Sequence, residues 1–195
     1  MLRTALTAVL TATASFAATY GVLPIPAPSG FTNPVMVGIN NSSQVAGYGT
    51  VGLLPQAFVG SPSGSIAIPL PAGFTKTQGL AINASGQVAG DAGGNINFSG
   101  FIGTPNGSAV IPVSGFANGN AVNDSGQVAG TITGGSFQVF IGTTSGSAII
   151  PLPVPRPPGM ATGEAVNNLG QVVGEVGPGP SRAFIGTTAG IVVIA

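Results

Sequence analysis

Short apolar runs rich in β-branched residues recur along the chain, and turn-forming Asn, Gly and Pro separate them. The clearest segment, 38–47, reads GINNSSQVAG and returns in related form three times, at 81–90, 121–130 and 165–174. Its asparagines, at 40, 83, 123 and 167, lie 43, 40 and 44 residues apart. No 3.6-residue period is sustained outside the amino-terminal segment, so the pattern predicts strands rather than helices.

Three further segments accompany each copy in the same order. A Gly-Phe or Gly-Met pair precedes each Asn, at 30–31, 73–74, 115–116 and 159–160. A Phe-Val-Gly or Phe-Ile-Gly strand follows, at 58–60, 101–103, 140–142 and 184–186. A β-branched run closes each unit, at 66–70, 110–113, 149–152 and 191–194, and most of these runs have Pro at an edge. Because these segments recur in the same order and at similar spacing over most of the chain, the sequence indicates four structural repeats.

Each repeat is expected to hold four short strands. The run before Asn is one strand and Gln-Val-Ala-Gly begins the next, with Asn-x-x-Gly as the turn between them. Asn suits the first position of a type I turn, and Gly takes the left-handed position that closes a bulged hairpin. The first copy has Ser43 in place of that Gly, which predicts a positive φ held at some cost. Phe-Ile-Gly forms the third strand, and the Pro-edged run is predicted as an outer fourth strand.

Four strands in about 43 residues match the strand number and the length of a β-propeller blade. The predicted fold is therefore all-β, a small β-propeller-like array of four-stranded units within one domain, residues 18–195. A β-solenoid is the main alternative and a β-sandwich the second. The expected repeats span approximately 27–70, 71–113, 114–153 and 154–195.

Residues 22–26, Val-Leu-Pro-Ile-Pro, look like a fifth copy of the Pro-edged strand ahead of the first full repeat. We expect an extra edge strand there. Both ends of the chain would then offer the same outer strand. One copy is either redundant or available for strand exchange between molecules, which would produce oligomers or fibres.

The recurring pattern A-x-N-x-x-G-Q-V-x-G followed by a Phe-x-Gly strand resembles the bacterial extracellular repeat family named for its His-Ala-Phe tripeptide. The resemblance covers about residues 21–195. No copy keeps the His, since the tripeptides read Gln-Ala-Phe, Ser-Gly-Phe, Gln-Val-Phe and Arg-Ala-Phe, at 56–58, 99–101, 138–140 and 182–184. The carboxy-terminal sorting tail of many such proteins is absent from this sequence. The resemblance implies a secreted bacterial β-repeat protein and says little about a ligand.

Charge narrows the range of partners. Only 4% of residues are charged and the formal net charge is zero, with four scattered basic residues. Nucleic-acid binding requires a basic patch, and a membrane-surface helix requires a basic face, so neither is expected. The 33 Gly and 17 Pro are interpreted as turn residues, because disordered chains combine low hydrophobicity with high charge and this chain is 44% hydrophobic.

The amino terminus predicts secretion. Arg3 forms a short positive region, a small and mostly apolar stretch runs from Thr4 to Phe16, and Ser15 and Ala17 suit a cleavage site. We therefore expect a signal peptide at 1–17 and an extracellular mature chain. The apolar run is too short and too rich in Thr for a membrane span, so none is expected in the mature chain.

The residue inventory argues against an enzyme. The chain has neither His nor Cys, which removes the usual acid–base pairs, nucleophiles and zinc ligands. A glycosidase would need two of the four acids to converge. Asp124 is expected in a turn, whereas Asp91 and Glu175, each after the Gly of a second strand, are expected to be solvated. A Ser–Lys pair using Lys76 and a weak calcium site at 123–126 are kept as minor alternatives. No catalytic, metal or cofactor-binding residue is assigned, and no cofactor is expected.

Two polar features suggest binding. Gln44, Gln87, Gln127 and Gln171 recur in every repeat, and either line a sugar-binding channel or satisfy backbone groups at each hairpin. The loops expected before the inner strands, 75–78, 118–120 and 162–164, are polar. The sequence therefore favours a secreted, non-catalytic structural or interaction protein, self-assembling through terminal edge strands or contacting the extracellular matrix. The alternative is a carbohydrate-binding propeller module.

Overall fold

The computed structural model describes residues 21–94, 96–134, 137–152, 161–177 and 181–194. Within these ranges all regular structure is β-strand, as predicted, and no helix occurs. The sixteen strands, in chain order, are β1 Thr32–Ile39, β2 Val45–Val51, β3 Leu54–Ser61, β4 Gly64–Ala67, β5 Lys76–Ile82, β6 Val88–Gly93, β7 Phe98–Thr104, β8 Gly107–Val110, β9 Ala117–Val122, β10 Val128–Ile132, β11 Gln138–Thr143, β12 Gly146–Ile149, β13 Ala161–Val166, β14 Val172–Val176, β15 Arg182–Thr187 and β16 Gly190–Val193. The predicted signal peptide and the fourth Gly-Met pair, 159–160, lie outside the described residues.

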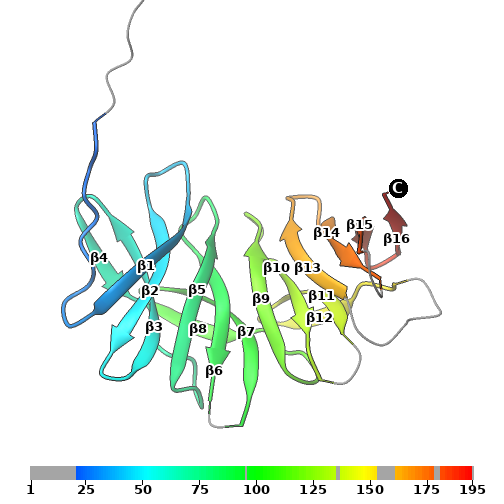
Figure 1. Cartoon of the computed structure of the whole chain (residues 1–195), viewed down its shortest axis with the longest axis horizontal. Coiled ribbons are helices and arrows are strands. Elements are labelled where there is room, and N and C mark those ends of the chain that lie inside the picture. Colours follow the sequence, from blue (N-terminus) through cyan, green and yellow to red (C-terminus); the bar gives the residue numbers. More distant parts are fainter. Residues whose placement is uncertain (1–20, 95, 135–136, 153–160, 178–180, 195) are drawn as a thin grey trace, which may run out of the picture.

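Each repeat forms one antiparallel four-stranded sheet with its strands in sequence order. We number these sheets 1 (β1–β4), 2 (β5–β8), 3 (β9–β12) and 4 (β13–β16). Every strand pair lies within one sheet in the described part of the chain, whereas a solenoid would pair strands of successive repeats. The fold is therefore the predicted β-propeller-like array of four units. Sheets 1 and 4 lie at opposite ends of the row (Figure 1).

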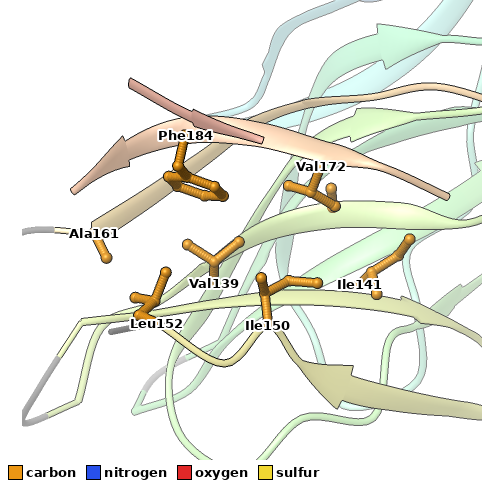
Figure 2. Packing of buried hydrophobic residues seen from close by; sticks show 8 residues of the cluster. Val139, Ile141, Ile150, Leu152, Ala161, Val172 and Phe184 are labelled. Atoms are coloured by element: carbon orange, nitrogen blue, oxygen red, sulfur yellow. The ribbon is translucent and has the colours of Figure 1, made fainter. Parts of the chain in front are cut away.

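The sheets stack face to face, and three hydrophobic clusters fill the spaces between them. We call the face that a sheet turns to the next sheet its leading face, and the opposite face its trailing face. Between sheets 3 and 4, the leading face contributes Val139, Ile141 and Ile150, and the trailing face contributes Val172 and Phe184 (Figure 2). The equivalent phenylalanines of all four repeats are fully buried, as expected for a core-facing aromatic: Phe58, Phe101, Phe140 and Phe184.

Glycine on the inner strands lets consecutive sheets approach closely. A Cβ on Gly79, Gly119 or Gly163 would lie 2.8 Å from a backbone carbonyl oxygen of the preceding sheet, at Gly47, Gly90 and Gly130 respectively. Backbone cannot move aside cheaply, so only Gly fits there. In sheet 1 the same register position, opposite Gly47, holds Met36. Sheet 1 has no preceding sheet in the described chain.

The Pro-edged runs are only partly strands, which corrects the sequence-based prediction. β4, β8 and β12 end before Ile68, Ile111 and Ile150, whose N–H groups still donate to the third strand of their own sheet, and Pro follows each Ile. The three isoleucines are fully buried and belong to the clusters between sheets. Pro lacks a backbone N–H, so the strand ends where the chain crosses toward the next sheet. These segments act as plugs between sheets.

Residues 22–26 form no strand, so the predicted extra edge strand is wrong. They instead occupy the place of the plug from a preceding repeat. A Cβ on Gly60 of sheet 1 would meet the Ile25 side chain, just as one on Gly103 would meet Ile68. The Ser65 hydroxyl donates to the carbonyl of Pro26, and the equivalent Ser108 hydroxyl donates to Pro69. The similarity of 22–26 to the later runs therefore reflects plug packing rather than strand pairing.

Candidate functional site

The Asn-x-x-Gly turns between the first and second strands form the most regular polar arrangement in the molecule. In sheet 2, the Asn83 Oδ1 accepts the N–H of Gln87 at 2.9 Å, and the Gly86 N–H donates to the Asn83 carbonyl at 3.1 Å. Gly86 has a φ of 81°, and Ser43 takes the same conformation with a φ of 58°. The predicted hairpin geometry is thus confirmed, including the strained serine.

The same asparagines join neighbouring sheets. The Nδ2 of Asn40 donates to the Asn83 carbonyl at 3.0 Å, that of Asn83 to the Asn123 carbonyl at 2.9 Å, and that of Asn123 to the Asn167 carbonyl at 2.9 Å. These bonds form an asparagine ladder along the row. Its turns surround a polar hollow of about 410 Å³, lined by residues from all four sheets, including Asn41, Asp124 and Asn168.

The recurring glutamines support these turns. Each side-chain oxygen accepts an N–H from the Asn of its own turn: Gln44 at 2.8 Å, and Gln87, Gln127 and Gln171 at 2.7 Å. The glutamines do not appear in the lining of the hollow. The hydrogen bonds agree with the structural interpretation of this column, because each amide satisfies the asparagine that closes its hairpin.

Asp124 lies in the turn of sheet 3, as predicted, and bridges the turns on both sides. Its carboxylate accepts the Ala84 N–H at 2.9 Å and the Asn168 Nδ2 at 2.8 Å. The Ala84 N–H, followed by the Asn168 amide, lowers the pKa of Asp124 below its usual value. The Asp124 N–H in turn donates to the Asn168 Oδ1 at 2.9 Å. This carboxylate therefore aligns neighbouring turns.

Asp91 is half-buried rather than solvated, so that prediction is wrong. It lies between sheets 2 and 3, where its carboxylate accepts the Gly119 N–H at 3.0 Å and the Asn118 Nδ2 at 3.4 Å. Burial raises the pKa of Asp91 to about 6, and the Gly119 hydrogen bond opposes this only in part. Thr131 occupies the equivalent position in sheet 3, and its hydroxyl accepts the Gly163 N–H at 3.1 Å. The position is thus an acceptor for the glycine of the next sheet.

The remaining charged candidates are not brought together. Glu175, at the position equivalent to Asp91, is exposed as predicted, and Glu164 is exposed on β13. The Lys76 Nζ lies 4.9 Å from the centre of the Phe98 ring, a cation–π contact on the surface. Among the described residues no group of three acids gathers to hold a metal, at 123–126 or elsewhere.

The polar loops expected before the inner strands are not loops. Residues 76–78, 118–120 and 162–164 lie within β5, β9 and β13, in the contacts between sheets, and only Thr75 of the predicted loop residues lies outside a strand. Asn120, for example, donates to the Gly163 carbonyl of the next sheet at 2.8 Å. Polar residues in this strand resemble turn signals in the sequence, but a strand crowded between two sheets needs small and hydrogen-bonding side chains rather than large apolar ones.

In the described residues no helix is long and apolar enough to cross a membrane. Comparison with protein-family models found no match, and comparison with curated proteins found none either.

Proposed function

We propose that this chain is a secreted, non-catalytic interaction scaffold, presenting a neutral β surface to extracellular material and to other copies of itself. One observation carries the proposal: the polar residues common to all repeats are used by the fold. The recurring asparagines and glutamines close turns and join sheets, as in the pair Asn83 and Gln87. Side chains that make these hydrogen bonds are not available to bind or activate a substrate. Resemblance to the His-Ala-Phe repeat proteins supports the extracellular placement.

Surface chemistry supports the same role. With 4% charged residues, the exposed polar groups are mainly hydroxyls, amides and backbone. A surface with almost no net charge offers little electrostatic repulsion against association. Several large apolar side chains are also exposed, among them Ile39, Val173 and Ile194. Such a surface suits adhesion to neutral polymers or to itself better than steering of charged ligands.

Carbohydrate recognition is the second candidate, and the hollow between the turns favours it. Its lining combines aliphatic side chains with amides and one carboxylate, including Asn41, Asp124 and Asn168, which can hydrogen-bond to sugar hydroxyls. It has no aromatic residue in its lining against which a sugar ring could stack. We therefore rank glycan binding below the scaffold role.

Retention of the purified chain on extracellular polysaccharide and on immobilised copies of itself tests the proposal. We expect retention on at least one of these surfaces, together with no turnover of glycoside, ester or peptide substrates. Turnover lost on replacing Asp91 or Lys76 would contradict a non-catalytic role. Specific glycan binding abolished by Asn168→Ala, but preserved in Leu53→Ala on the distant β2–β3 hairpin, would favour the carbohydrate-binding alternative.

A further inference from the structure

The leading face of sheet 4 carries apolar residues like those of the internal contact faces, but no sheet of the described residues packs against it. Val173 is 38% exposed and Ile194 is 54% exposed, whereas their counterparts Ala129 and Ile150 in sheet 3 are fully buried. Ala183 is also exposed, although Val139 at its register position is buried. The Ile194 N–H donates to the Ala183 carbonyl at 2.8 Å, as the Ile150 N–H does to Val139 at 2.9 Å. The fourth plug is therefore formed, but it fills no space between two described sheets.

The asparagine ladder has complementary ends. Within the described chain the Asn167 Nδ2 donates only to Gln171, although each earlier asparagine also reaches the next sheet. At the other end, the Asn40 carbonyl accepts only the Ser43 N–H. One end thus has a spare donor and the other a spare acceptor.

A second set of bonds ends in the same way. The side chains of Asp124 and Asn168 accept the N–H of Ala84 and Asp124, one sheet earlier. Asn41 occupies this position in sheet 1, exposed and without a described donor. Beside it, Ile39 is 71% exposed, while Ile82 at the same position in sheet 2 packs on sheet 1. Both ends of the row therefore carry apolar surface beside a matching hydrogen-bonding edge.

We propose that the leading face of sheet 4 binds the trailing face of sheet 1 in a second copy, head to tail, extending the stacking seen within the chain. The inference rests on the proposed scaffold function and names its partner. Asn167 would donate to the partner's Asn40 carbonyl, and the Asn168 N–H to the partner's Asn41. A closed set of copies gives a discrete oligomer, and an open set gives filaments.

Two features make this contact looser than the internal ones. Met36 occupies the position that is Gly in sheets 2 to 4. In the contacts within the chain, a Cβ on any of those glycines would lie 2.8 Å from a carbonyl oxygen of the preceding sheet. Ile25 already occupies the site on sheet 1 that a preceding plug would fill. The sheets of two copies must stay slightly further apart, so we expect reversible association. Met36→Gly should strengthen it, whereas Met36→Ala, which keeps the Cβ, should not.

Sedimentation velocity over a wide concentration range tests the contact, using the chain purified after secretion from a bacterial host. Val173→Asp and Ile39→Asp each place a charge on one of the two faces, and each should weaken self-association at least about a hundredfold. Both side chains are exposed in the single chain, so folding should survive, as checked by thermal unfolding. Leu53→Asp makes the same change on a hairpin at 95% exposure and should leave association unchanged.

Mixing the two blocked variants distinguishes head-to-tail contact from other arrangements. Each mixed chain keeps one intact face, so an equimolar mixture should form a one-to-one complex that neither variant forms alone. Association of Ile39→Asp at wild-type strength would show a symmetric contact between sheet 4 faces and overturn the proposal. Strictly monomeric behaviour of both the wild type and Met36→Gly would also overturn it. Neither result bears on retention by polysaccharide, which tests the scaffold function separately.

Discussion

Replacing Asp91 by Asn tests the contact between sheets 2 and 3. The half-buried carboxyl has a pKa of about 6 against an ordinary value of 3.8, because burial disfavours its charged form. The stability that this group contributes is therefore fully present below pH 3.8 and is lost as the pH rises through about 6. The neutral amide of Asn avoids this loss. It also keeps an oxygen to accept the Gly119 N–H, while the Asn118 amide can rotate to present its own oxygen.

The size of the effect follows from the two pKa values. Their difference corresponds to on the order of 3 kcal/mol, an upper limit because the site is not fully enclosed. At pH 8 the variant should therefore unfold about 5 to 10 °C above the wild type. Near pH 4 the two should converge. The residues paired with Asp91 on β5 and β7, Gln78 and Gly100, are uncharged, so no neighbour across the strands offsets the change.

Thermal and urea unfolding between pH 3.5 and 8 provide the assay, and the difference between variant and wild type isolates this one group. Glu175→Gln is the matched control, since it makes the same acid-to-amide change at the equivalent position of β14, where the carboxylate is exposed. Its unfolding should follow the wild type throughout. A constant difference between Asp91→Asn and the wild type across this range would refute the burial argument.

Three further substitutions test the contacts that repeat along the row, each by urea unfolding. Gly119→Ala should destabilise by about 2–4 kcal/mol, because the new Cβ meets the Gly90 carbonyl; an unchanged midpoint would contradict the close approach. Asn123→Ala should cost about 2–4 kcal/mol by breaking its turn and its bond to Asn167, so a loss below that of one surface bond would count against the ladder. Ser43→Gly should stabilise by roughly 0.5–1 kcal/mol through relief of its positive φ, and destabilisation would show the serine to be unstrained.

The repeat arrangement was predictable because its signals are local. Asn83, Gly86 and Gln87 specify a hairpin within five residues, and the fourfold recurrence turns one turn prediction into four strand pairs. The burial of the central phenylalanines was predictable because an aromatic side chain recurs at one place in every repeat, although these strands are buried on both faces. Sequence reasoning thus succeeded where the signal is local to one turn or one strand.

Features that depend on contacts between sheets were missed. Ile68 looks like part of an outer strand, yet its side chain fills the space between its own sheet and the next one. Asp91 resembles a surface acid until the Gly119 N–H of another sheet is placed beside it. Both positions recur in every repeat, and Asp91, Thr131 and Glu175 align once the strands are superposed. The sequence alone shows this alignment. Which face of its sheet the aligned side chain occupies, and what it contacts there, follows only from how the sheets stack.

The central claim is that the stacking within one chain continues between chains, and an engineered disulfide tests it most directly. The chain has no cysteine, so any cross-link must involve the introduced residues. Internally, a Cβ on Gly38 would lie 3.5 Å from the Ile82 side chain, and Ala165 and Ile39 occupy the equivalent positions on the two outer faces. The two positions are thus in van der Waals contact, so cysteines introduced there are near enough to cross-link.

The measurement is the yield of cross-linked product after mild oxidation of Ile39→Cys and Ala165→Cys chains, alone and mixed. Head-to-tail stacking predicts that the mixed pair cross-links far more than either chain alone and more than a Leu53→Cys control. Preferential linking of Ala165→Cys to itself would contradict the account, and so would a mixed yield no higher than the control.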